Sequence, residues 1–168
     1  LKQGGLSLIY LGLESGSPTI LENMNKGSTP KENIEAILKA KEAGLKTSVM
    51  VISGLGGQSL TQEHALLSAQ AISQMNPDFF SLLTLYIENH SPLKERIKTK
   101  ELTLLTPLKI LEETKLMIQN IQGKNIVFRS NHASNYLNLA GILSRDKEIL
   151  LQEIQKALNQ NNTKAEFF

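Results

Sequence analysis

Apolar runs that predict strands alternate with amphipathic stretches that predict helices in the first half of the chain. The apolar runs cover residues 6–13, 46–52 and 78–87, and each contains β-branched or aromatic residues. Strands that are covered on both faces, as in a parallel sheet, have this pattern. Apolar positions at helical spacing predict helices over 30–43 and 61–75. The order strand, helix, strand, helix, strand predicts right-handed crossovers and parallel pairing.

Capping signals bound the two predicted helices. Thr29 and Glu32 have the spacing of a capping box, with proline between them in the first turn, and Gly44 ends the same helix. Ser59 with Gln62 gives a similar but weaker start for the second helix.

The pattern changes after Pro92. The remaining predicted elements are a short helix ending near Arg96, a helix over 107–122 capped by Thr106, a short strand over 124–129, and a final helix capped by Ser144. We therefore predict a half-barrel of three strand–helix units over 1–92 and a mostly helical extension over 93–168. By pattern alone, the units fit half of an eight-stranded barrel or part of a doubly wound sheet.

Charge, apolar runs and cysteine content limit the class of protein and the partners that the sequence allows. The net charge of +2 comes from 18 basic and 16 acidic residues scattered along the chain, which gives no signal for a nucleic-acid or membrane surface. No apolar run approaches the roughly 20 residues of a membrane span, so we expect a cytoplasmic protein. The absence of cysteine excludes disulfides and thiolate-held iron–sulfur clusters within this chain. The start at Leu1, close to a predicted strand, predicts a fragment of a longer protein.

Polar residues follow each predicted strand, in loops 14–18, 53–59 and 88–92, which should converge at one edge of a parallel sheet. Glu14 and Ser15 could accept hydrogen bonds from ligand hydroxyl or ammonium groups. Alternatively, Glu14 caps the helix that starts near Pro18, and Ser15 or Ser17 is its N-cap.

The second and third loops carry other candidate chemistry. The sequence GLGG at 54–57 lets the backbone approach a flat or phosphorylated ligand, or it is a tight turn that requires positive φ. Glu88 and His90 could form an acid–base pair, or they are solvated loop residues. His64 shares no loop with them, and we expect it on a helix surface.

The segment RSNHASNY at 129–136 is dense in hydrogen-bonding side chains. It could fold over a ligand as a lid or recognition loop. Equally, it could be a connector in which Asn and Ser satisfy the backbone of irregular turns.

Taken in order, these segments resemble the radical S-adenosylmethionine (radical SAM) enzymes, in particular their iron–sulfur oxidoreductase branch. GLESGSPTILENMNKG at 12–27 resembles the strand and turn that contact the ribose of SAM in that family. GLGG at 54–57 resembles the loop beside the adenine, and FFSLLTLY at 79–86 the strand whose backbone lies along it. Residues 128–136, with Asp146 and Lys147, resemble a C-terminal segment of this branch.

Three positions depart from the family pattern. The three-cysteine motif that binds the [4Fe–4S] cluster is absent and would precede Leu1, so this chain alone could not hold the cluster. Lys26 stands where many relatives have an arginine that clamps the SAM carboxylate, and a lysine offers a point charge in place of a fork. Met50 stands where some relatives have an aspartate on the ribose.

The resemblance implies the C-terminal half of a partial (β/α) TIM-like barrel with C-terminal helices, inactive alone. The complete enzyme would use SAM and a [4Fe–4S] cluster to generate a 5′-deoxyadenosyl radical that abstracts hydrogen from a substrate. Implied SAM contacts are Glu14, Ser15, Lys26, Ser53, Gly54, Leu55, Gly56 and Leu85. Candidate substrate contacts are Glu88, His90, His132, Asn135 and Tyr136.

Two other classes of protein remain open from the sequence. One is a barrel enzyme that uses Glu14 and His90 as acid and base without SAM, and the other is a complete, non-enzymatic α/β binding domain. The half-barrel hypothesis also predicts self-association through the open strand edge at 6–13.

Overall fold

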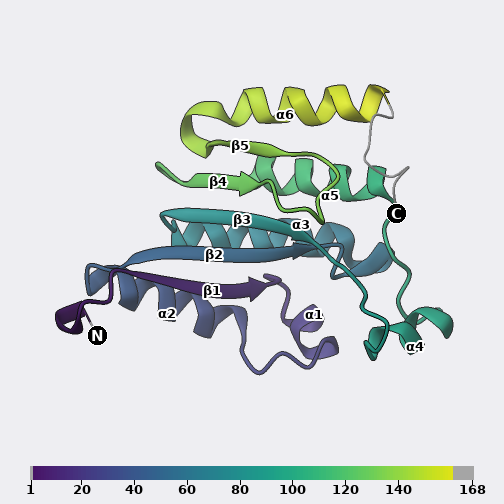
Figure 1. Cartoon of the computed structure of the whole chain (residues 1–168), viewed down its shortest axis with the longest axis horizontal. Coiled ribbons are helices and arrows are strands. Elements are labelled where there is room, and N and C mark those ends of the chain that lie inside the picture. The colour runs from purple at the N-terminus through teal and green to yellow at the C-terminus, as the bar shows by residue number, and fades with distance from the viewer. Residues whose placement is uncertain (1, 161–168) are drawn as a thin grey trace.

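One five-stranded sheet, with helices packed along one of its faces, forms the body of the protein (Figure 1). The computed structural model describes residues 2–160. In chain order the elements are a 3₁₀ turn at Lys2–Gly4, β1 (Leu8–Glu14), α1 (Pro18–Asn23), α2 (Pro30–Glu42), β2 (Lys46–Ser53), α3 (Gly57–Met75), β3 (Phe79–Thr84), α4 (Leu93–Lys98), α5 (Pro107–Asn120), β4 (Val127–Ser130), β5 (Leu139–Ile142) and α6 (Leu143–Gln160).

The strands lie in sequence order, β1-β2-β3-β4-β5. The first four are parallel because a helix carries the chain back between successive strands. The segment between Ser130 and Leu139 is too short for such a crossover, so β5 pairs with β4 in the antiparallel sense. This mostly parallel, helix-backed sheet confirms the predicted α/β, half-barrel class.

Successive side chains of each strand point to opposite faces of the sheet, one of which is packed against helices while the other is not. Val49, Phe80 and Phe128 are fully buried toward the helices, and the two phenylalanine rings lie 5.5 Å apart between centroids. On the opposite face Tyr10 is 75% exposed and Phe79 39% exposed. We call this second face, which α2, α3, α5 and α6 do not cover, the open face.

Several predicted boundaries are confirmed and others are wrong. The Thr29–Glu32 capping box is present, and Thr106 accepts from the Lys109 N–H as the cap of α5. The predicted caps Ser59 and Ser144 are wrong because α3 starts two residues before Ser59, after Gly56, and the Ser144 hydroxyl accepts from the Asn125 N–H outside the helix. The sheet includes β4 and β5, which follow residue 92 in the chain, and the division of the chain at that residue stays a prediction. The predicted extension runs past the described part of the chain at 161–168.

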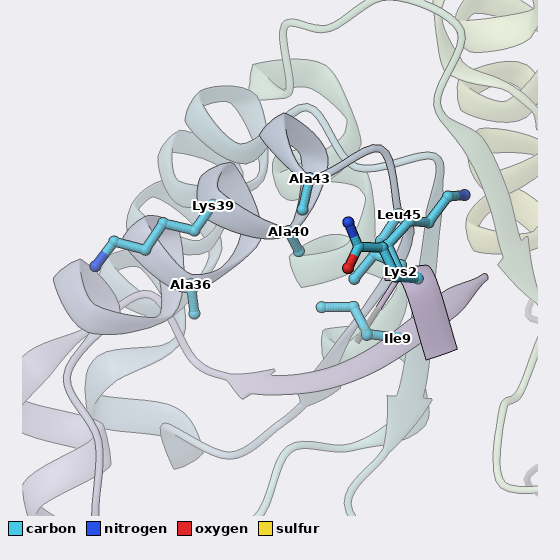
Figure 2. A pocket seen from close by; sticks show the side chains of 8 residues that line it. Lys2, Ile9, Ala36, Lys39, Ala40, Ala43 and Leu45 are labelled. Carbon is cyan, nitrogen blue, oxygen red and sulfur yellow. The ribbon is translucent and has the colours of Figure 1, made fainter. Parts of the chain in front are cut away.

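The outer side of β1 pairs with no other strand among residues 2–160. Beside it, where β1 meets α2, a largely apolar pocket of about 570 Å³ is lined by Ile9, Ala36, Ala40 and Leu45, with Lys2 at its edge (Figure 2). An unpaired edge next to apolar surface favours pairing with another chain. Self-association through 6–13 stays a prediction. We expect the weight-average mass of the 168-residue chain in sedimentation equilibrium to rise with concentration, and a constant monomer mass would contradict it.

Candidate functional site

Glu14, the last residue of β1, has a left-handed backbone that turns its side chain back over the sheet. Its φ is 63°, and the pairing register with β2 shifts between Gly12 and Glu14, as at a β-bulge. The Glu14 carboxylate lies over Gly12, where any Cβ would overlap Oε1. Glycine at position 12 therefore makes room for a carboxylate at the carboxyl edge of the sheet, in a backbone conformation that costs free energy.

Lys26 returns to this carboxylate after the short helix α1. Its backbone N–H donates to the Leu21 carbonyl at 2.9 Å, and its Nζ lies 3.4 Å from Glu14 Oε2. The side chains are 41% and 20% exposed, so the ion pair contributes little stability. Both remain accessible to a polar ligand at this edge.

Ser15 is buried, in contrast to Glu14. Its Oγ donates to His64 Nδ1 at 2.8 Å and accepts from the Ser17 N–H at 3.0 Å. The Ser15 hydroxyl thus makes two hydrogen bonds within the protein, and its predicted contact with a ligand stays a prediction. Ser17 is the N-cap of α1, as the alternative interpretation held, and its hydroxyl donates to Glu63 at 2.5 Å.

His64 is wrongly predicted as a surface residue, because it is fully buried on α3. Its Nε2 donates to the Ile52 carbonyl at 3.0 Å, which leaves Nδ1 to accept from Ser15. Burial lowers the pKa of His64 to about 4, against the opposing effect of the Ile52 hydrogen bond, so the ring is neutral at pH 7. Through these two hydrogen bonds, the neutral His64 ring connects the turn after β1 to the end of β2.

A second buried group, Glu113 on α5, holds the glycine loop after β2. Its Oε1 accepts from the Gly54 N–H at 2.7 Å, and its Oε2 accepts from the Thr61 hydroxyl at 2.7 Å. Burial raises the pKa of Glu113 to about 7, against the effect of these two hydrogen bonds. His64 Nε2 lies 3.9 Å from Glu113 Oε1. The two groups together join both candidate loops to the helical layer.

The glycine loop itself packs tightly against the protein. Gly54 and Gly57 have positive φ, which supports the interpretation of this segment as a tight turn. The side chains of Ser53 and Leu55 are buried and face away from solvent. Gly56 is buried as well. The buried Ser53 Oγ has no hydrogen-bond partner among the described residues, and the predicted contacts of Ser53 and Leu55 with SAM stay a prediction.

The loop after β3 is the most exposed of the three. β3 ends at Thr84, earlier than predicted, and the Leu85 N–H donates to the Ser53 carbonyl at 2.9 Å. Leu85 is half-buried beside the glycine loop, whereas Glu88 and His90 are exposed on the way to α4. Figure 1 shows α1 and α4 at the same end of the sheet, beyond the carboxyl ends of β1–β3. The predicted convergence of the loops at one edge is thus observed for their backbones.

The segment 129–136 is anchored to β3 through Asn135. The buried Asn135 amide donates to the Leu82 carbonyl at 2.8 Å and to Ser130 Oγ at 3.1 Å, and its oxygen accepts from the Thr84 hydroxyl at 3.0 Å. Asn135 therefore anchors this segment to β3, and its predicted contact with substrate stays a prediction. His132 is exposed, with Nδ1 bonded to Ser134, and Tyr136 is half-buried.

In α/β barrels, the carboxyl edge of the parallel sheet is where ligand sites are usually found, and polar groups lie at that edge here. Within residues 2–160, no group of three or more His, Asp or Glu side chains is placed to hold a metal ion. The same part of the chain contains no helix with the length and hydropathy of a membrane span.

The comparisons with known proteins show similarity to one superfamily. Residues 1–68 match the sequence model of the Radical SAM superfamily. The solved structure of Methanocaldococcus infernus Elp3 superposes with a TM-score of 0.69 at 18% identity, over 97% of this chain and 38% of that one. Methylornithine synthase superposes with a TM-score of 0.53 at 18% identity, over 95% of this chain and 52% of that one. The sequence match to the Radical SAM superfamily thus covers residues 1–68, and the two superpositions show a shared fold over nearly the whole chain.

The curated relatives match shorter parts of the chain. An uncharacterized methyltransferase of Pyrococcus horikoshii is 34% identical over 51% of this chain and 19% of its own length. A putative methylthiotransferase of Methanocaldococcus jannaschii is 38% identical over 29% of this chain and 11% of its own length. The chain thus spans less than a fifth of the length of these relatives.

Proposed function

We propose that the full-length protein is a radical SAM enzyme of the cytoplasm, and that this chain forms the ribose and adenine side of its SAM site. Glu14 accepts hydrogen bonds from the ribose hydroxyls, and Lys26 faces the SAM carboxylate. The main chain of the glycine loop and of Leu85 lies along the adenine. The [4Fe–4S] cluster is held by cysteines elsewhere in the full-length protein, so this chain alone is inactive.

One observation carries this proposal. The Glu14 carboxylate is held in a left-handed turn over Gly12, partly exposed at the carboxyl edge of a parallel sheet. A carboxylate in this position accepts two adjacent hydroxyl groups, the arrangement that a ribose presents. Its contact is with Lys26 rather than with His90, so the described contacts give no support to an acid–base pair of Glu14 and His90.

The buried polar groups serve to position these elements. Ser15 and His64 fix the turn that follows Glu14, and Glu113 fixes Gly54 at the start of the glycine loop. Two separate segments of backbone are therefore fixed relative to one another before a ligand binds. When bound, SAM and the reduced cluster together supply the 5′-deoxyadenosyl radical that abstracts hydrogen from substrate.

Glu14→Gln tests the SAM site. We expect the affinity for S-adenosylhomocysteine to fall at least about 10-fold, because an ionised acceptor is replaced by a neutral one of the same shape. Isothermal titration calorimetry of the full-length protein measures the effect.

Glu22→Gln is the matched control, since Glu22 is an exposed carboxylate on neighbouring α1. We expect this variant to bind with the affinity of the unchanged protein. Equal affinities of the Glu14 variant and the unchanged protein would contradict the proposal.

A further inference from the structure

Arg129 lies on the open face of β4, three strands away from β1, which carries Glu14. The strand register places Arg129 beside Ser81 of β3 and opposite Ala140 of β5, in one row with Met50 and Gly12. The other charged strand residues of this face, Glu14 and Lys46, lie at its two edges. Arg129 is thus the cation within an otherwise apolar and hydroxyl-bearing surface over the described strands.

A pocket of about 200 Å³ opens beside this guanidinium. Its walls include the rings of Tyr10 and Phe79 and the hydroxyl side chains of Ser48 and Ser81. Tyr10 and Phe79 come from different strands and are both partly exposed to solvent. The pocket therefore offers flat apolar walls with hydroxyl donors and one cationic group.

The Arg129 guanidinium has more N–H donors than its one hydrogen bond within the described residues uses. An Nη1–H donates to the Phe128 carbonyl at 2.9 Å, and within residues 2–160 no carboxylate lies within ion-pair distance of Arg129. By contrast, Arg96 pairs with Glu101 and Arg145 with Asp146, each at 2.7–2.8 Å. The edge formed by Nε and Nη2 is the one that binds carboxylate and phosphate oxygens in a bidentate manner.

We propose that Arg129 binds the anionic group of an organic carboxylate or phosphate whose apolar body packs on Tyr10 and Phe79. A guanidinium loses hydration when a ligand or another part of the protein covers the open face, and an anion of matching geometry compensates for that loss. The identification of this anion as the substrate of the enzyme rests on the proposed function. The anion site itself does not depend on SAM.

The test compares matched aromatic ligands of different charge on the full-length protein. The probes are phenylacetate, phenyl phosphate and the neutral phenylacetamide, and binding is measured by saturation-transfer NMR. We expect at least one anion to bind at least 10-fold more tightly than the amide. Arg129→Gln should abolish that preference, and Arg129→Lys should retain part of it, since lysine keeps the charge without the fork.

Arg145→Gln is the control, because Arg145 is exposed on α6 and pairs with its neighbour Asp146. It should leave the preference for anions unchanged, and urea unfolding of each variant confirms that it is folded. The proposal is overturned if the unchanged protein shows no preference for the anionic probes. This holds also if the cause is a carboxylate elsewhere in the full-length protein that pairs with Arg129. A preference that survives in Arg129→Gln would also overturn it.

The same samples separate this inference from the proposed function. S-adenosylhomocysteine is titrated into the unchanged protein independently of the aromatic probes. If anions bind and S-adenosylhomocysteine does not, the result supports the anion site and contradicts the SAM site. If S-adenosylhomocysteine binds and the protein shows no preference for anions, the result supports the SAM site and contradicts the anion site.

Discussion

Gly16→Ala should destabilise the protein by about 3 kcal/mol, at the upper end of the usual range for overpacking. The turn after β1 passes so close to α3 that a Cβ on Gly16 would overlap the Leu67 carbonyl and the Ser68 nitrogen. These are backbone atoms inside a helix and cannot move aside as a flexible side chain would. Displacing the turn would also break the 2.8 Å hydrogen bond from the Gly16 N–H to Ser68.

Urea unfolding of the Gly16 and Gly27 variants of the full-length protein measures this effect through the midpoint concentration. Gly27→Ala is a matched control, since no atom of the described residues other than 26–28 lies within 4 Å of the position of its added Cβ. We expect the control to stay within about 0.5 kcal/mol of the unchanged protein. A Gly16 variant as stable as the Gly27 variant would mean that the turn is not packed against α3 as described.

Glu113→Gln should stabilise the protein at pH 8 and have little effect at pH 4.5. Burial raises the pKa of Glu113 from 4.5 to about 7, so the folded state favours the protonated carboxyl. The contribution of this group to stability is fully present below pH 4.5 and is lost as the pH rises through about 7. The shift corresponds to about 3 kcal/mol. Glutamine keeps an oxygen for the Gly54 N–H without the cost of a buried charge.

The measurement is the difference in the free energy of unfolding between the variant and the unchanged protein, at both pH values. His64 acts in the opposite direction, because its lowered pKa gives stability that is lost as the pH falls from 6.5 through about 4. Taking the difference at each pH removes most of this contribution. Glu112→Gln is the control, since the Glu112 side chain is 50% exposed. A difference that does not change with pH would contradict the assigned burial of Glu113.

Short-range signals account for the elements that the sequence predicts well. The Thr29–Glu32 capping box, Gly44 at a helix end and the apolar runs of β1 and β2 all depend on neighbours in the chain. The sequence does not predict β5, because its four residues alternate only weakly and are stabilised by pairing with β4.

The buried polar network could not be predicted from the sequence. His64 and Glu113 find their partners Ser15 and Gly54 across 49 and 59 positions of the chain. Their burial follows from how α3 and α5 pack on the sheet. The one available signal was that His64 lies on the helical face next to Ala65 and Ser68, which the apolar pattern buries. The sequence suggests an exposed Ser15 because turns at a sheet edge are usually exposed, whereas here the neighbouring Gly16 packs closely against α3.

A crystal structure of the full-length protein with S-adenosylhomocysteine tests the proposed SAM site. We expect the ribose hydroxyls within hydrogen-bond distance, about 2.5–3.2 Å, of the Glu14 carboxylate at the carboxyl edge of β1. We also expect the adenine beside the Gly54 loop and Leu85. A nucleoside bound elsewhere, with Glu14 still paired to Lys26 alone, would contradict the proposed site.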